Sequence, residues 1–387
     1  MSEYQYYEFQ AIDKPLTDKD RQALRNLSTR ARITSTSFVN EYQWGDFKGD
    51  PLKLMEKYFD AFLYFANWGT HWFMLRIPRK LIDVELVKKY CIGESATIYE
   101  KDDYLIFEFQ VETEDYEDYY EFEEDESQLS SLISLRSDII RGDYRCLYLA
   151  WLLCAQLGEI ENDSFEPPVP ANLKNLNAPL KSFVDFMKID MDLIEAAAEN
   201  SVSEEKKIKG NTEKLKSWVA ALPEGEKNEI IFKLISENEQ HIGTTLMQRF
   251  EKSISGENTF LSGLKPRKVC ELLEKAEIIT KKRERRESEQ KAAEKARKEK
   301  EAKEKREKYL NDLAKREDKA WKKVNKLVES KKQVNYDEAV KLLVDLRELN
   351  VRERKQDKFK EGLREISEKH SKKPSFIERL KSAGLVR

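Results

Sequence analysis

The sequence is poor in the residues that carry metal and nucleophilic chemistry. Its 387 residues include only 3 histidines and 4 cysteines. The histidines are His71, His241 and His370, and the cysteines are Cys91, Cys146, Cys154 and Cys270. They show neither the CxxC spacing nor the clustering that zinc and redox sites need. We therefore expect no metal site, no cofactor and no catalytic residue, and we favour a protein that is not an enzyme.

A phosphate-binding loop, a secretory signal and a membrane-spanning run are also missing. The glycines of Gly45–Asp50 are not followed by the Gly-Lys-Ser/Thr of a P-loop, whose amides and lysine would cradle phosphates. The chain begins MSEYQYYEF, which lacks the basic and apolar regions of a signal peptide. No apolar run reaches the ~18 residues of a transmembrane helix. We expect a cytoplasmic protein with reduced thiols and no membrane partner.

The segment 281–308 has no side chain larger and more apolar than alanine, and no glycine or proline. Such a segment cannot bury itself, so it must be solvated. Its Ala, Glu, Lys and Arg residues favour a helix, and Glu precedes Lys by four residues at five places. We predict one continuous helix from about Lys281 to Val328, which at about 1.5 Å per residue is a rod of roughly 72 Å.

The last part of this predicted helix, which we call the arm, carries a short apolar seam. Leu310, Leu313, Ala320, Val324 and Leu327 follow a/d heptad spacing, with Glu317 interrupting it. The seam covers less than the ~3–4 heptads that indicate a coiled coil. It can serve a partner, or it can pack on the C-terminal helices of the same chain. The candidate partner-binding residues of this seam are Leu310, Leu313, Trp321 and Val324.

Charge is distributed unevenly along the chain. Residues 281–387 hold 36 Lys and Arg against 22 Asp and Glu, a net charge of +14, whereas residues 1–280 hold 34 against 51, a net of -17. The densest basic cluster consists of Lys281, Lys282, Arg283, Arg285 and Arg286. We expect these residues to meet a protein partner, a second copy of the chain or a nucleic acid.

An acidic strip lies in the other half of the chain. Ten of the 15 residues in Glu112–Glu126 are acidic, and Tyr119 and Tyr120 lie among them. The strip is interpreted either as a solvated loop or as a docking surface for a basic partner, which would include the two tyrosines.

The order of apolar patterns predicts an α+β N-terminal domain with a mainly antiparallel sheet and helices. An all-α region follows, with one long solvated charged helix and a small C-terminal helical module. EPPVP at Glu166–Pro170 marks the first boundary. The expected divisions are an α+β head over 1–165, a helical middle domain over 171–279, the long charged helix over 280–330 and a helical hairpin module over 334–387.

Two resemblances accompany these patterns. The stretches YQYYEFQAIDKPLT, SFVNEYQWGDFKGDP and YFDAFLYFANWGT resemble an uncharacterised family of bacterial cytoplasmic proteins, and the similarity covers most of the chain. The segment Tyr336–Leu385, beginning YDEAVKLLVDLRELN, resembles the C-terminal helical segment of bacterial SWIM zinc-finger proteins. The CxC and CxH zinc motif of those proteins is absent here. Neither resemblance implies a catalytic residue.

Three hypotheses about function follow. The first is a non-enzymatic cytoplasmic scaffold or adaptor that docks a protein partner through its helical arm and C-terminal helices. The second is a nucleic-acid-binding protein that uses the basic C-terminal arm, although eight Glu residues are interleaved among the 14 basic residues of Lys281–Lys308. The third is an enzyme with an unrecognised site in the N-terminal domain. Salt dependence separates the first two, because phosphate contacts release counterions.

Overall fold

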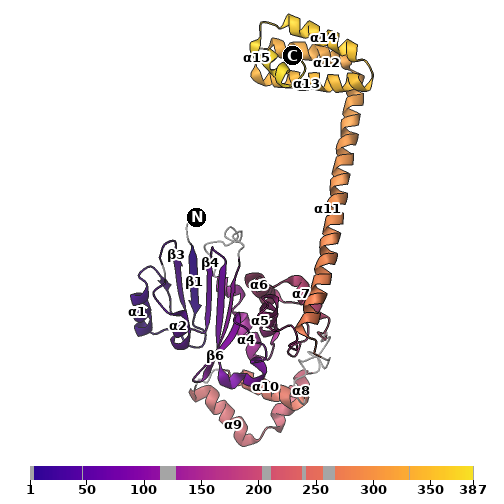
Figure 1. Ribbon diagram of the computed structural model, residues 1–387. Coiled ribbons are helices and arrows are strands. Elements are labelled where there is room, and N and C mark those ends of the chain that lie inside the picture. The colour runs from indigo at the N-terminus through magenta and orange to yellow at the C-terminus, as the bar shows by residue number, and fades with distance from the viewer. Residues whose placement is uncertain are drawn as a thin grey trace. The chain divides into compact units, whose positions relative to one another are not determined.

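The computed structural model describes residues 4–45, 47–113, 128–202, 211–237, 241–255, 266–330 and 332–386 (Figure 1). The chain forms two compact units, Met1–Arg283 and Glu284–Arg387. The first unit is an α+β fold around one sheet, and the second is built from helices. The fold class predicted from the sequence is confirmed.

Within the described residues, unit 1 is built on a seven-stranded antiparallel sheet with the strand order β2-β3-β1-β4-β5-β7-β6. The strands are β1 (Gln5–Gln10), β2 (Arg32–Ile33), β3 (Ser37–Tyr42), β4 (Ala61–Ala66), β5 (Thr70–Pro78), β6 (Ala96–Lys101) and β7 (Tyr104–Glu112). A hairpin joins β4 and β5. Its turn holds Gly69 at φ +98, where a Cβ would lie 1.8 Å from the Thr113 carbonyl oxygen, so only glycine fits.

Both faces of the sheet are covered, because strand alternation places apolar side chains on each. Helices α4 (Ser134–Ile140), α5 (Arg145–Gln156), α6 (Ala178–Phe186) and α7 (Met191–Ala198) pack on the face that carries Leu63 and Phe65. Helices α1 (Asp18–Leu27) and α2 (Pro51–Lys57) cover the face that carries Phe62 and Tyr64. Residues 146–155 of α5 are all buried, in keeping with the apolar composition of this helix.

The segment after Glu166–Pro170 belongs to the same core as the sheet. The ring centroid of Phe183 on α6 lies 5.4 Å from that of Phe109 on β7 and 6.1 Å from that of Phe73 on β5. Val269 also joins this apolar cluster. The proline-rich segment is therefore not a boundary between two cores, and the helices that follow it complete the head.

Two helix starts follow the sequence signals. Thr17 caps α1 through its hydroxyl, which accepts from the Asp20 amide at 3.2 Å, while Asp20 accepts from the Thr17 amide at 3.0 Å. Asp50 caps α2 by accepting from the Lys53 amide at 3.2 Å, and Pro51 is the first helical residue. These contacts satisfy amides that would otherwise lack partners.

The remaining elements of unit 1 lie before α4 and between α7 and α11. They are η1 (Arg79–Leu81), α3 (Val84–Val87), η3 (Gln128–Ser131), α8 (Asn211–Ala221), α9 (Glu224–Phe232), the π-helical turn η4 (Lys233–Glu237) and α10 (Ile242–Ser255). Gln248 of α10 donates to the carbonyl oxygens of Leu81 and Ile140 at 2.9 and 2.6 Å, which fastens α10 to the head.

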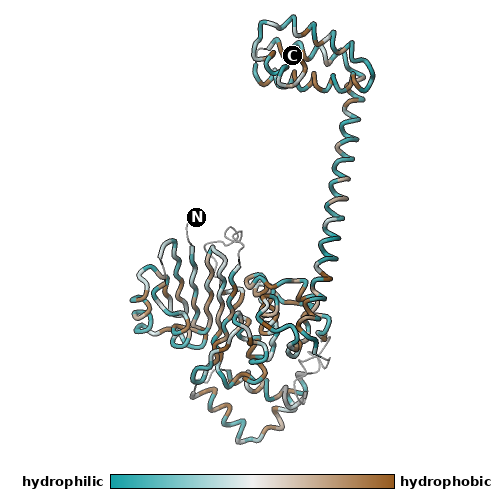
Figure 2. The backbone as a smooth tube through the Cα atoms, in the orientation of Figure 1, coloured by the Kyte–Doolittle hydropathy of each residue, from teal (hydrophilic) through white to brown (hydrophobic). Residues whose placement is uncertain are grey.

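Helix α11 (Val269–Ala314) is 46 residues long and contributes to both units. Val269 and Leu272, in its first turn, are fully buried in the core of unit 1. Every residue from 281 to 305 is exposed, and Figure 2 shows this stretch as mostly hydrophilic. The predicted long, solvated, charged helix is confirmed, although it starts 12 residues before Lys281.

The predicted continuation of this helix to Val328 is wrong. Helix α11 ends at Ala314, and α12 (Glu317–Glu329) begins after a two-residue break in which Arg316 has φ -130 and ψ 29. Leu310 and Leu313 lie before the break and share one apolar cluster with Ala320, Val324 and Val328 of α12.

Unit 2 has its own apolar cluster. Helices α13 (Gln333–Arg352), α14 (Gln356–Lys369) and α15 (Pro374–Ser382) form the predicted C-terminal module, and they pack together with α12 and the end of α11. Arg306 on α11 pairs with Asp345 and Glu348 on α13, each at 2.6 Å. The C-terminal module therefore begins before Leu310, earlier than the sequence boundary at residue 334.

Candidate functional site

The basic cluster at the start of the arm is largely neutralised within the chain. Lys281 pairs with Glu277 at 2.6 Å, and Arg285 pairs with Glu289 at 2.9 Å. Arg283 pairs with Asp192 of α7 at 2.9 Å, and this pairing lowers the pKa of the Asp192 carboxyl. Lys282 and Arg286 are exposed. The five residues are thus not one unopposed stripe, and Arg283 helps to hold α11 on unit 1.

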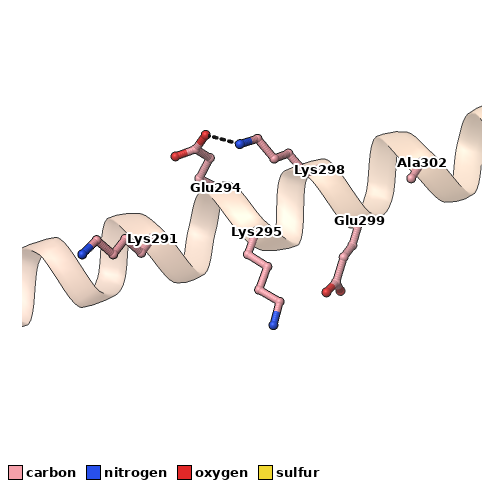
Figure 3. A pocket seen from close by; sticks show the side chains of 6 residues that line it. All are labelled: Lys291, Glu294, Lys295, Lys298, Glu299 and Ala302. Carbon is pink, nitrogen blue, oxygen red and sulfur yellow. Dashed lines mark ion pairs between the residues drawn. The ribbon is translucent and has the colours of Figure 1, made fainter.

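The exposed middle of α11 offers no enclosed site. Figure 3 shows the side chains of Lys291, Glu294, Lys295, Lys298, Glu299 and Ala302, which line a shallow surface of this one helix. Lys298 pairs with Glu294 at 2.7 Å. A surface made by a single helix cannot surround a ligand, and ligand sites are concave and largely apolar.

The apolar seam is buried inside unit 2. Leu310, Leu313 and Val324 are 4%, 2% and 0% exposed. Trp321 is half-buried, and its ring centroid lies 5.8 Å from that of Phe359 on α14. Of the two alternatives for this seam, the structure thus has it packed on the C-terminal helices of the same chain. These four residues stabilise the module and are not a free docking surface.

The acidic strip cannot be placed. Tyr119 and Tyr120, and nearly all of Glu112–Glu126, lie outside the described residues.

Helix α12 presents a row of lysines to solvent. Lys319, Lys322 and Lys326 recur at intervals of three and four residues, so they share one side of the helix. All three are exposed, whereas the buried residues of α12 are Ala320, Val324 and Val328. None of the three forms an ion pair with another described residue. We call this row the α12 lysine face. Sequence reasoning missed it, although the 3,4 spacing was visible.

Helix α9 and the following π turn expose four large apolar side chains. Ile231, Phe232, Leu234 and Ile235 are 52%, 62%, 53% and 80% exposed. In the sequence, Ile231, Leu234 and Ile235 follow the spacing of one side of an amphipathic helix. We call this group the α9 apolar surface. Contiguous exposed apolar groups of this kind mark interaction sites.

A buried cluster of charges lies in unit 1. Asp60 accepts from Arg76 Nε and Nη2 at 3.2 and 2.9 Å, and from the amides of Ile12 and Asp13 at 2.6 and 2.9 Å. Arg136 of α4 donates to Asp13 at 2.6 Å, and His241 lies 3.2 Å from the same carboxylate. Each carboxylate is already held by an arginine, so the cluster ties α4 and the loop after β1 to the sheet.

Three cysteines of unit 1, Cys91, Cys146 and Cys154, are not activated. Burial raises the pKa of Cys91 and Cys146 well above the ordinary value, and it raises the pKa of Cys154 to about 12. These thiols stay protonated at neutral pH, whereas nucleophilic cysteines need a lowered pKa. In the described part of the chain no three His, Cys, Asp or Glu residues are placed to hold a metal ion.

Comparison with known proteins adds no relative. No protein-family model, curated protein or solved structure matches the chain. Both resemblances noted in the sequence therefore stay predictions. A search of the described helices for one with the length and apolar character needed to cross a bilayer found none.

Proposed function

We propose that this protein is a non-enzymatic cytoplasmic adaptor that docks a protein partner. The observation that carries the proposal is the α9 apolar surface. Fully burying a side chain of the size of Ile or Leu is worth about 1.5–3 kcal/mol, so the exposed Ile231, Leu234 and Ile235 can supply several kcal/mol of binding free energy. The seam residues Leu310, Leu313, Trp321 and Val324 pack in the core of unit 2, so they are not available to a partner. We therefore assign the docking site to the α9 apolar surface of unit 1.

The way the two units are joined supports the same role. Each unit has its own apolar cluster, and α11 contributes to both. Its exposed stretch buries nothing, so it adds a linker without adding to either core. A chain built in this way can hold one partner on unit 1 while unit 2 carries a separate surface.

The test replaces apolar atoms on α9 without weakening its helix. In the full chain, Ile231→Gln with Ile235→Gln removes two exposed apolar side chains and introduces a good helix former at both positions. The matched control is Asn228→Gln with Glu229→Gln on the same helix, where both residues are exposed.

Each tagged chain is purified from the native cell, and bound proteins are quantified by mass spectrometry. The leading partner is then titrated against the purified variants. We expect the control to bind like the unchanged chain and the Ile variant to bind at least about 100-fold more weakly. Equal binding by all three chains would refute docking through α9.

A further inference from the structure

The α12 lysine face has a geometry that the rest of the basic arm lacks. Lys319, Lys322 and Lys326 lie along about 10.5 Å of helix axis, at about 1.5 Å per residue. On α11, by contrast, charges of both signs alternate, and Lys298 and Arg285 are paired with Glu294 and Glu289. The positive charges of the α12 lysine face therefore follow one another along one side of the helix, without an ion-paired Glu between them.

Neighbouring groups leave this face positive. Lys323 is paired with Glu338 at 2.5 Å, and Glu329 is paired with Lys369 at 3.1 Å. Asp318 is four residues before Lys322 but forms no ion pair with a described residue. The turn between α14 and α15 lies against the carboxyl end of α12, because Lys373 donates to the Val328 carbonyl oxygen at 2.5 Å.

Two lysines near the carboxyl end of α12, Lys369 and Lys373, act on a neighbouring histidine. Burial lowers the pKa of His370, and the positive charges of Lys373 and Lys369 lower it further. His370 also lies 3.1 Å from Asn325 on α12. Lys369 and Lys373 therefore add positive charge around His370, at the end of α14.

The lysine face lacks the groups that other partners require. Its only aromatic neighbour on α12, Trp321, is packed against Phe359 and Gly362. Protein hot spots need aromatic or apolar anchors, interfacial helices need apolar side chains to insert, and single-stranded nucleic acids need stacking platforms. Lysine ammonium groups act as point charges that suit phosphate, without the planar fork that reads bases.

We propose that the α12 lysine face binds the phosphate backbone of duplex DNA without sequence selectivity. A row of about 10.5 Å, extended at both ends by flexible lysine side chains, can reach phosphates on the two edges of a major groove about 12 Å wide. The deep, narrow major groove of duplex RNA fits a helix poorly. This proposal is independent of docking through α9.

The test measures binding of the full chain to a 20-base-pair fluorescent duplex at increasing salt. The triple variant Lys319→Gln, Lys322→Gln, Lys326→Gln is compared with Lys295→Gln, Lys300→Gln, Lys303→Gln on α11, which removes the same charge from another exposed helix. Each phosphate contact adds about -0.9 to the slope of log affinity against log salt. Relative to the unchanged chain, we expect the slope of the α12 variant to be smaller in magnitude by about 2.7. The slope of the α11 control should be smaller by less than about 0.9.

For a protein that makes three such contacts, raising the salt concentration from 50 to 200 mM weakens binding about 40-fold. We also expect duplexes of unrelated sequence to bind equally, and duplex RNA, single strands and phosphatidylserine vesicles to bind more weakly. Equal slopes for the two variants would overturn the proposal, as would tighter binding to any of those three competitors. Circular dichroism verifies that both variants fold. The Ile231→Gln, Ile235→Gln chain should bind DNA normally, so failure of one proposal is distinguishable from failure of the other.

Discussion

The indole ring of Trp321 lies so close to Gly362 that a Cβ atom at position 362 would meet three ring atoms at 3.0–3.2 Å. Trp321 belongs to α12 and Gly362 to α14, so this contact sets how closely the two helices pack. A glycine inside a helix costs about 1 kcal/mol relative to alanine. The close approach of the ring explains why α14 contains one.

Replacing this glycine should reveal the contact through coupling. In the unchanged chain we expect Gly362→Ala to give no gain in the local stability of α14, because overpacking offsets helix propensity. In a Trp321→Leu background the same substitution should stabilise α14 by about 1 kcal/mol. Amide hydrogen exchange of α14 measures the effect of Gly362→Ala on local stability in both backgrounds. Gly225→Ala, at a position with no atom within 4 Å of the added Cβ, is the control that should gain stability alone. Additive effects at 321 and 362 would contradict this explanation.

A buried ion pair fastens the start of α11 to unit 1. Arg267 donates to Glu166 at 2.8 and 2.9 Å and to the carbonyl oxygen of Ala196 at 2.8 Å, and Tyr148 donates to Glu166 as well. We expect Glu166→Ala to cost about 3–5 kcal/mol, because it leaves a buried guanidinium without its carboxylate.

The double variant Glu166→Met, Arg267→Met should recover part of that loss, since replacing both charges avoids an unpaired one. Chemical denaturation of the full chain, followed by circular dichroism, provides the comparison. A double variant less stable than Glu166→Ala would count against this account.

Acid should weaken the hold of α7 on α11. The pKa of Asp192 is lowered in the folded chain, first by its hydrogen bond with Arg283. A carboxyl whose folded pKa is below its unfolded value of about 3.8 adds stability that is complete above that value and is lost as pH falls through the folded pKa. We expect thermal stability to fall below about pH 4, and less steeply in Arg283→Gln. Lys282→Gln, one residue away and exposed, should keep the full pH dependence.

The shared core of unit 1 predicts the behaviour of fragments. A fragment of residues 1–170 lacks Phe183 and Val269, which pack in the same apolar cluster as the sheet. We expect it to melt without cooperativity, whereas residues 1–283 should melt in one sharp transition. Calorimetry distinguishes the two, and a cooperative transition in the shorter fragment would show that the helices after Pro170 are dispensable.

Local patterns in the sequence were enough to predict much of the fold. The Thr17–Asp20 capping box, the Asp50–Pro51 helix start and the all-apolar α5 depend on neighbouring residues, so they could be read directly. The mainly antiparallel character of the sheet followed from the order of strands and helices along the chain.

Long-range packing could not be read in the same way. A seam such as Leu310–Leu313 indicates which residues are buried but not which surface buries them. For the same reason the helical spacing of Ile231 and Ile235 does not reveal whether a surface covers them, and in the structure both are exposed. The basic cluster at Lys281–Arg286 was conspicuous by composition, yet its neutralisation by Glu277, Asp192 and Glu289 required three-dimensional contacts.

The exposed stretch of α11 also has a mechanical consequence. Between residues 281 and 305 the helix is held by its own hydrogen bonds and by surface ion pairs, each worth at most about 1 kcal/mol. Under tension applied to the two ends of the chain, this stretch should unwind before either apolar cluster opens. Passing from about 1.5 to about 3.4 Å per residue would lengthen it by roughly 45 Å. The linker would then act as an extensible element that limits the force reaching both units.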